Sequence, residues 1–396
     1  MPPVLPPPDG LRDRFQRLPG AAQGALLGLA AVLAAAVPWA LHAAGEGGGL
    51  FSNQVMTLLA QVAIFALAAL GLNVVTGYTG QLNLGFTAFL AIGAYTCGIL
   101  LRDGLPGDGA WWREPWPFWA AIPAAALHAG IWAVLLGLPI LRLTGDYFAI
   151  VTFGFAELVV LTARNWNSVT GGTQGLKDVP FATLGPAEDP LLSFSVGVGQ
   201  MGPLWALSVL LCAAGFFLTW RITHSRVGLA WRSIREDEVA AQACGVDLGM
   251  YKSLAFFWSG VLGGLAGAML PMLYGGVYVT QFLFIFSVYI LVYVVFGGMG
   301  SMTGSIAGAT ILMVLVELLR EAIEAFNARD YGIRANPELR YMVYGLLLIL
   351  MVRFRPEGIF PSRRVAGELH PDTARVLEQE QVTLYDWAHP HETRLR

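Results

Sequence analysis

Two long stretches without a charged residue constrain the fold of this chain more than any other feature. No Asp, Glu, Lys or Arg occurs between Glu46 and Arg102, and none occurs from Ser253 to Val316. A helix needs about 20 mostly apolar residues to cross a bilayer. The first stretch therefore has room for two spans, and the second for two spans plus a re-entrant piece or for three short spans. The chain is 56% hydrophobic and 13% charged, whereas soluble domains are about 45–50% apolar and about 25% charged. The sequence therefore predicts an α-helical membrane protein.

Further apolar runs complete the predicted membrane domain. The first, residues 18–45, is longer than the apolar core of about 7–15 residues in a secretory signal, so we expect a retained span. We predict an all-α, polytopic transmembrane bundle of about ten spans, with eight or nine as alternatives, and with broken or re-entrant segments. The remaining runs are residues 115–141, 147–163, 190–220 and 341–352.

The arginines and lysines between the spans predict the orientation, because these residues concentrate in cytoplasmic loops. We expect a cytoplasmic N-terminal segment at residues 1–20, a cytoplasmic loop at residues 221–252 and a cytoplasmic polar tail at residues 361–396. The turn-rich segment 164–200 is expected outside. Residues 21–360 then form the membrane domain with its loops.

The stretch SRVGLAWRSIREDEVAAQACGVDLGMYKSLAF, residues 225–256, is the most charged part of the middle of the chain. Val227, Trp231 and Ile234 share one helical face, acids follow where a second helix begins, and Gly245 is a typical helix stop. Helices this short are marginal alone in water, so the loop packs on its own bundle or docks a cytoplasmic partner. The candidate docking residues are Arg232, Arg235, Glu236, Asp237, Glu238, Ala240, Ala241 and Gly245.

Polar residues lie among glycines inside the first long apolar stretch. Such groups are tolerated at membrane depth where they pair or line a cavity, and interhelical hydrogen bonds of about 0.6–2 kcal/mol are the simpler explanation. We favour a broken helix that lines a substrate route, because glycines lower the cost of unwinding. The candidates are Asn73, Thr76, Gly77, Gly80, Gln81 and Asn83, and more weakly Gly297, Gly298 and Gly300.

Glu157 is the one acid inside the otherwise charge-free run 147–163. A carboxylate at membrane depth is expensive unless it is paired or faces water. A polar contact with another helix accounts for it more simply than a proton relay, since a single acid makes no relay. We keep Glu157 among the candidate residues of the substrate route.

Several catalytic patterns are missing from the sequence. Its lysines, Lys177 and Lys252, follow Leu and Tyr, so no GxxxxGK[ST] loop for nucleotide phosphates occurs. Neither HExxH nor the G-x-S-x-G elbow occurs, and the three cysteines lack metal-ligand spacing. We predict a chain that is not an enzyme and that has no cofactor or metal of its own. The net charge of −3 gives no indication of a nucleic-acid partner.

Several blocks in order resemble the branched-chain amino acid (LIV-type) permeases of ABC importers. IREDEVAAQACGVD, followed by YKSLAFFWSGVLGGLAGAML, looks like their cytoplasmic coupling loop and the next span. That loop has an EAA-x-x-x-G pattern; here Val239, Ala240 and Ala241 are followed by Gly245, with the acid displaced to Glu238. The other blocks are GLNVVTGYTGQLNLGFTAFLAIGAYTCGIL, RLTGDYFAIVTFGFAELV, NWNSVTGGTQGL, VYVVFGGMGSMTGSIAGA and YGLLLILMVRFRPEGIF.

This resemblance implies a translocating permease subunit in the lipid of a bacterial inner membrane, working by alternating access. It implies a second homologous permease, two cytoplasmic ATPase subunits that hold the ATP, and an extracytoplasmic substrate-binding protein. The implied cargo is branched-chain or related amino acids, while close relatives handle urea and short amides. A stand-alone secondary transporter is the alternative; it leaves the loop 221–252 without a purpose and has Glu157 as its coupling-ion candidate.

Overall fold

The computed structural model describes residues 53–102, 116–140, 145–177, 179, 182–184, 192–194, 201–328, 339–354 and 358–360. The expected N-terminal segment 1–20, the expected first span 18–45 and the expected tail 361–396 lie outside these residues. The described chain is helical apart from its connections and one two-stranded ribbon. The predicted all-α class is thus confirmed for this part of the chain.

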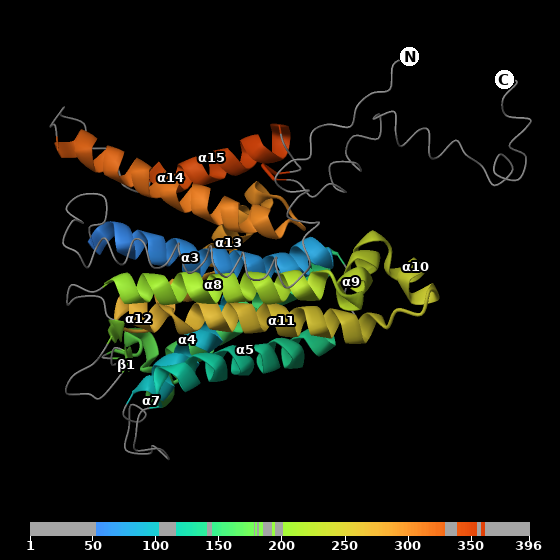
Figure 1. Ribbon diagram of the computed structural model, residues 1–396, viewed down its shortest axis with the longest axis horizontal. Helices are drawn as coiled ribbons and strands as arrows, with labels where there is room; N and C mark the ends of the chain where they lie inside the picture. Colours follow the sequence, from blue (N-terminus) through green and yellow to red (C-terminus); the bar gives the residue numbers. More distant parts are fainter. Residues whose placement is uncertain are drawn as a thin grey trace, which may run out of the picture.

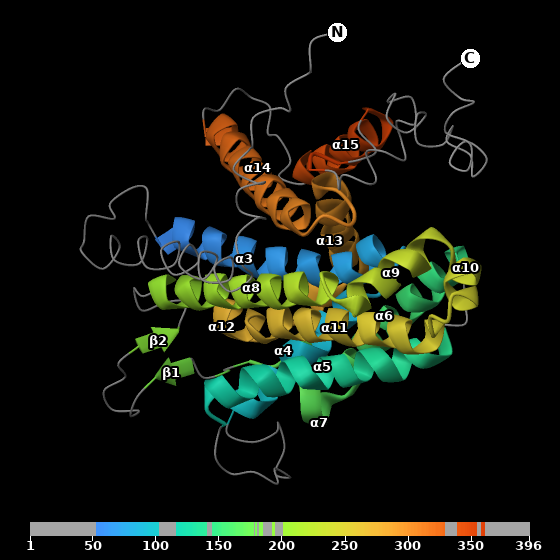
Figure 2. The same cartoon turned by 45° about the vertical axis from the view of Figure 1, so that its right-hand side comes forward.

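Four long helices form the central bundle. They are α3 (Asn53–Asn73), α5 (Phe118–Ile140), α8 (Met201–Thr223) and α11 (Leu248–Ala268), which lie side by side (Figures 1 and 2). Small residues set the spacing of α5 against α11, since a Cβ added to Gly264 would lie 2.5 Å from the Cβ of Ala129. In lipid, van der Waals packing at such close approach holds helices together.

Two further helices are short and follow breaks in the chain. α4 (Thr87–Leu101) has 15 residues and α13 (Phe284–Gly297) has 14. At about 1.5 Å per residue they are about 21–23 Å long, less than the ~30 Å hydrocarbon core. The π-helical turn η1 (Val74–Tyr78) precedes α4, and α12 (Leu270–Tyr274) and the 3₁₀ turn η3 (Val279–Phe282) precede α13. The predicted broken segments are therefore present.

Six helices of the described chain are long and apolar enough to cross a membrane. They are α3 with η1, α5, α6 (Asp146–Asn165), α8, α11 with α12, and α14 (Met302–Ala328). The short final run forms α15 (Leu339–Phe354), with 16 residues. The predicted number of about ten spans is not confirmed, because α4, α13 and α15 fall short of this length and the first expected span lies outside the described residues.

At one end of the bundle, on the right in Figure 1, two short helices join α8 to α11. They are α9 (Arg226–Glu236) and α10 (Glu238–Ala243). This α9–α10 loop, residues 226–247, lies within the loop that the sequence predicts to be cytoplasmic. The predicted apolar face is turned inward, because Trp231 and Ile234 are buried and Val227 is half-buried, while Arg226 and Glu236 are exposed.

The opposite end of the bundle holds the described parts of the predicted outer segment (Figure 1). Leu176 and Val277 exchange two backbone hydrogen bonds of 2.9 Å, which tie this segment to the connection between α12 and η3. Its elements are α7 (Asn167–Thr170), η2 (Gly172–Gln174) and the antiparallel strands β1 (Ala182–Leu184) and β2 (Leu192–Phe194). One end of the bundle thus carries the helical α9–α10 loop, whereas the other carries short turns and a two-stranded ribbon.

α14 and α15 diverge from the central bundle (Figures 1 and 2). α14 packs against α13 and α3, while much of its surface and that of α15 is open. Leu318, Met342 and Ile349 are among their exposed apolar side chains. Exposed apolar surface of this extent is unfavourable in water and fits a location in lipid.

Candidate functional site

The chain breaks where α3 meets the glycine-rich segment. After Asn73 it makes the π-helical turn η1 and then runs without helical structure from Thr79 to Gly85. The hydroxyl of Thr79 and the backbone N–H of Gln81 both donate to the carbonyl of Val75, at 2.7 and 3.2 Å. Such π-helical turns are rare in proteins, and those that occur are often found at functional sites. We call residues 73–85 the first break.

Two glycines are required for this geometry. Gly80 has φ of 74°, a left-handed conformation that L side chains rarely adopt. A Cβ added to Gly77 would overlap both the side-chain oxygen of Asn73 and the backbone nitrogen of Gly300. Gly80 therefore allows the turn, and Gly77 allows the close approach of Asn73 and Gly300.

The second predicted break lies between α13 and α14. Gly298 and Gly300 have φ of 112° and 80°, which turns the chain sharply between the two helices. The N–H of Gly300 donates to Oδ1 of Asn73 at 2.9 Å. The two breaks, which lie 227 residues apart in the sequence, therefore meet in space. The N–H groups of Ile359 and Phe360 donate to the carbonyls of Phe296 and Gly297, which attaches these two residues to the end of α13.

The polar side chains of the first break are buried with unused hydrogen-bonding capacity. Asn73, Thr76, Gln81 and Asn83 are between 0 and 8% exposed. One polar atom in each has no hydrogen-bond partner within the described residues: Nδ2 of both asparagines, Oγ1 of Thr76 and Oε1 of Gln81. A buried unpaired group costs about 1–3 kcal/mol. The structure thus brings the predicted route residues together inside the chain rather than on its outer surface.

Burial and hydrogen bonds anchor the α9–α10 loop to the bundle. Trp231 is fully buried, and its indole N–H donates to the carbonyl of Tyr251 at 2.9 Å. Arg232 donates to the carbonyl of Thr223 at 3.0 Å, beneath the ring of Tyr78. Arg235 donates to the carbonyl of Gly77 at 2.6 Å. Both predicted docking arginines therefore bond to their own chain.

The acids of the loop set the position of α10. Asp237 caps this helix, since its Oδ1 accepts from the N–H groups of Val239 and Ala240 at 2.8 and 3.0 Å. Glu238 pairs with Nζ of Lys252 at 2.7 Å, and the lysine side chain is only 3% exposed. Gly245 follows the C-cap with φ of 86°, as the predicted helix stop requires.

The surface of this end of the molecule is partly apolar. Among the predicted docking residues, Glu236, Ala240 and Gly245 are exposed, whereas Ala241 is buried. Large apolar neighbours are exposed as well: Leu229 by 60%, Val239 by 78% and Met250 by 61%. Apolar side chains exposed on an otherwise polar loop are typical of an interaction surface.

Glu157 lies at the edge of an outward face of α6. Its side chain is half-buried, and no described residue forms a hydrogen bond or ion pair with it. Neighbouring positions on the helix are open: Leu158 and Leu161 are 61% and 55% exposed, and within the described chain no atom lies within 4 Å of a Cβ added to Gly154. The predicted contact with another helix of this chain is therefore absent from the described part.

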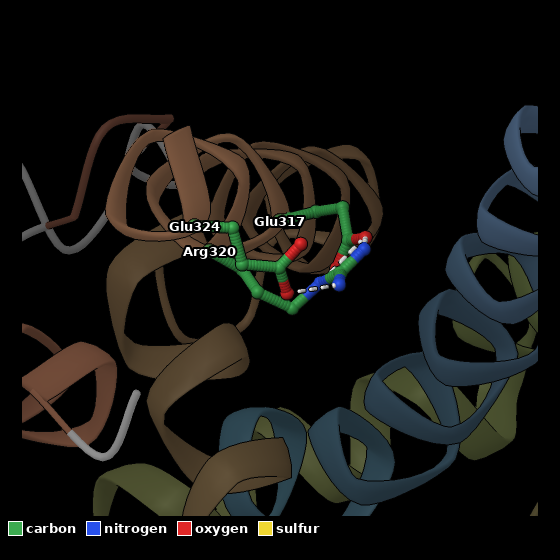
Figure 3. A network of polar contacts seen from close by, with 3 residues as sticks. All are labelled: Glu317, Arg320 and Glu324. Carbon is green, nitrogen blue, oxygen red and sulfur yellow. Dashed lines mark hydrogen bonds and ion pairs between the residues drawn. The ribbon is translucent and has the colours of Figure 1, made fainter. Parts of the chain in front are cut away.

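The structure also shows polar contacts that sequence reasoning did not assign. Thr87 and Ser287, near the first turns of the two short helices, share a buried hydroxyl contact of 2.7 Å. Arg320 bonds both Glu317 and Glu324 on α14 (Figure 3). The spacing of Glu317, Arg320 and Glu324 by three and four positions could have predicted these ion pairs. The position of Lys252 at the edge of a charge-free run could likewise have indicated that it needs an acidic partner. The Thr87–Ser287 contact had no signal in the sequence.

No group of three His, Cys, Asp or Glu residues within the described ranges is placed to hold a metal ion. The geometry is instead that of a bundle of apolar helices, broken at glycines and joined to a packed polar loop. It defines a multi-pass membrane protein whose candidate site lies where the two glycine-rich breaks meet.

Similarity to known proteins identifies the family. A family model described as "Branched-chain amino acid transport system / permease component" matches residues 54–352. The chain is 34% identical over 361 residues to the high-affinity branched-chain amino acid transport system permease protein LivM of Escherichia coli, covering 88% of this chain and 77% of that protein. The chain therefore belongs to the family of branched-chain amino acid ABC transport permeases.

More distant relatives carry related names. The chain is 23% identical over 337 residues to a probable LivM protein of Methanocaldococcus jannaschii, covering 78% of this chain and 94% of that protein. It is 26% identical over 324 residues to the LivH permease protein of Salmonella typhimurium, covering 78% and 95%. No solved structure matches the chain.

Proposed function

We propose that this chain is the translocating subunit of an ATP-driven importer that moves branched-chain or related amino acids across a bacterial inner membrane. The observation that carries the proposal is the α9–α10 loop. It is held on the bundle by Trp231 and by the Glu238–Lys252 pair, and it still presents Val239 at the surface. Together with exposed Leu229 and Met250, this side chain gives the loop an apolar surface that a partner protein can cover.

In the proposed assembly, two cytoplasmic ATPases bind at the α9–α10 loops of this chain and of a second homologous permease. ATP binds to the ATPases, because this sequence has no phosphate-binding loop. A substrate-binding protein docks at the opposite end, beside α7. Both chain termini then lie in the cytoplasm, and lipid and the second permease cover the open faces of α14 and α15.

Alternating access requires an element with two arrangements, and the first break is suited to that role. Its unpaired groups on Asn73, Thr76, Gln81 and Asn83 are not used in the arrangement described. A second arrangement that gives them partners or water recovers about 1–3 kcal/mol for each group. Movement of the ATPases on ATP binding would drive the loop and, through it, the break.

Glu157 is assigned to the substrate route. An amino acid crosses the membrane as a zwitterion, and its ammonium group needs an acceptor away from bulk water. Glu157 is half-buried, and no described residue is paired with it. We expect its carboxylate to face the space between this chain and the second permease, where it meets the ammonium group of the passing substrate.

The test is uptake by the complete complex in liposomes. We expect labelled leucine to enter only with ATP, and Glu157→Gln to lower this uptake about tenfold through loss of a charged hydrogen bond, while Glu157→Asp keeps most of it. Uptake driven by an ion gradient without the ATPases would overturn the importer. Uptake of urea in place of leucine would change the cargo, and equal uptake by Glu157→Gln would remove that residue from the route.

A further inference from the structure

We propose that Arg235 is the residue that transmits movement of the α9–α10 loop into the membrane domain. This inference rests on the proposed importer function and goes beyond it. It assigns Arg235 a positioning role that is distinct from the loop surface that binds the ATPase. The sequence pattern placed Arg235 among the residues that touch the ATPase. Its side chain instead points into its own bundle, where Nη1 donates to the carbonyl of Gly77 at 2.6 Å.

The acceptor is a carbonyl that the break leaves available. In a regular α-helix the N–H of Gln81 would donate to the carbonyl of Gly77, four residues earlier. Here the N–H of Gln81 donates to the carbonyl of Val75 at 3.2 Å. The guanidinium of Arg235 therefore bonds to a carbonyl that has lost its helical donor.

Glycines form the space that holds the arginine. A Cβ added to Gly80 would lie 3.1 Å from Cγ of Arg235, and one added to Gly300 would lie 2.8 Å from its Nη1. Gly300 also donates to Asn73. One side chain of the loop thus contacts the first break, from α3, and the second break, between α13 and α14.

Two other anchors of the loop end on a regular helix. Trp231 donates to the carbonyl of Tyr251, and Glu238 pairs with Lys252, both in the first turns of α11. A regular helix moves as a unit, whereas a π-helical turn next to a non-helical stretch can change its dihedral angles at lower cost. Arg232 also lies near this element, with its guanidinium carbon 6.0 Å from the centre of the Tyr78 ring. Arg235 is the anchor that bonds to the backbone of the deformable element, and we assign it the transmission of loop displacement.

The first experiment compares Arg235→Gln with Arg226→Gln in the full complex. Arg226 lies on the same helix and is exposed, and it makes no hydrogen bond or ion pair within the described ranges, so its replacement removes the same charge without the contact. We measure assembly, ATP hydrolysis and leucine uptake. For Arg235→Gln we expect normal assembly and continued hydrolysis, with uptake per ATP falling about tenfold, the scale of a lost charged hydrogen bond.

Each other outcome has a defined meaning. Unchanged uptake per ATP in Arg235→Gln overturns the inference, and so does loss of assembly, which would make Arg235 a structural residue. Absence of ATP-driven uptake in the unmodified complex would instead contradict the proposed function itself. Hydrogen exchange in the unmodified complex is the second measurement: exchange in residues 74–85 has to change between the nucleotide-free and vanadate-trapped states, and identical exchange there also overturns the inference.

Discussion

The α9–α10 loop and the first break lie in contact, yet they are built in opposite ways. In the loop, polar groups have partners: Asp237 caps α10, Glu238 pairs with Lys252, and Trp231 bonds to Tyr251. In the break, four buried polar side chains each keep an atom without a partner in the described chain. The difference shows that a charged, exposed segment can have its polar groups more completely paired than a buried one. The exposed loop has these polar groups paired, whereas the buried segment retains polar atoms that a second arrangement can pair.

The largest effect is expected from crowding the break. Gly77→Ala places a methyl group over Asn73 and Gly300, and overpacking of this kind costs about 1–3 kcal/mol. We expect a lower melting temperature of the purified complex and little remaining uptake. Gly154→Ala is the matched control, because no described atom lies within 4 Å of the added carbon. Equal melting temperatures for the two variants would show that the break tolerates side chains.

A smaller effect is expected from unpairing the ion pair of the loop. Glu238→Gln leaves the ammonium group of Lys252, 3% exposed, without its carboxylate. Removing one partner of a buried pair is strongly destabilising, and the partial exposure of Glu238 reduces the cost to about 1–2 kcal/mol. Lys252→Met is the comparison, since the remaining carboxylate is 33% exposed and reaches water. A larger loss of stability in Lys252→Met than in Glu238→Gln would contradict this assignment of the buried charge.

The smallest effect is expected at the cap of α10. Asp237→Ala removes the acceptor for two backbone N–H groups, which costs about 1 kcal/mol. Asp237→Asn keeps a capping oxygen and is expected to behave like the unmodified chain. Hydrogen exchange of residues 238–243 measures the change directly. Fraying confined to α10, with the break unaffected, would sharpen the distinction between the two regions, while equal exchange in both variants would speak against the cap.

Particular residues show how far the sequence reaches. The helix stop at Gly245, the buried face of Trp231 and Ile234, and the break around Gly77 and Gly80 follow from local rules of spacing and conformation. The inward direction of Arg235 does not, because a charged residue on an amphipathic helix is equally compatible with a partner protein and with its own bundle. The predicted number of spans is not confirmed within the described residues. The two charge-free runs contain the short helices α4 and α13 and several turns in addition to helices long enough to cross a membrane.

By itself, the sequence determined the class of the chain, the places where helices break and the position of the polar loop. These properties depend on residues close together along the chain: apolar length, glycine content and the order of acids and alanines. Tertiary structure alone decided that Asn73 meets Gly300 and that Arg235 reaches Gly77. The reason is physical. Hydrogen bonds between residues 158 and 227 positions apart depend on how whole helices pack, and no local pattern specifies that packing.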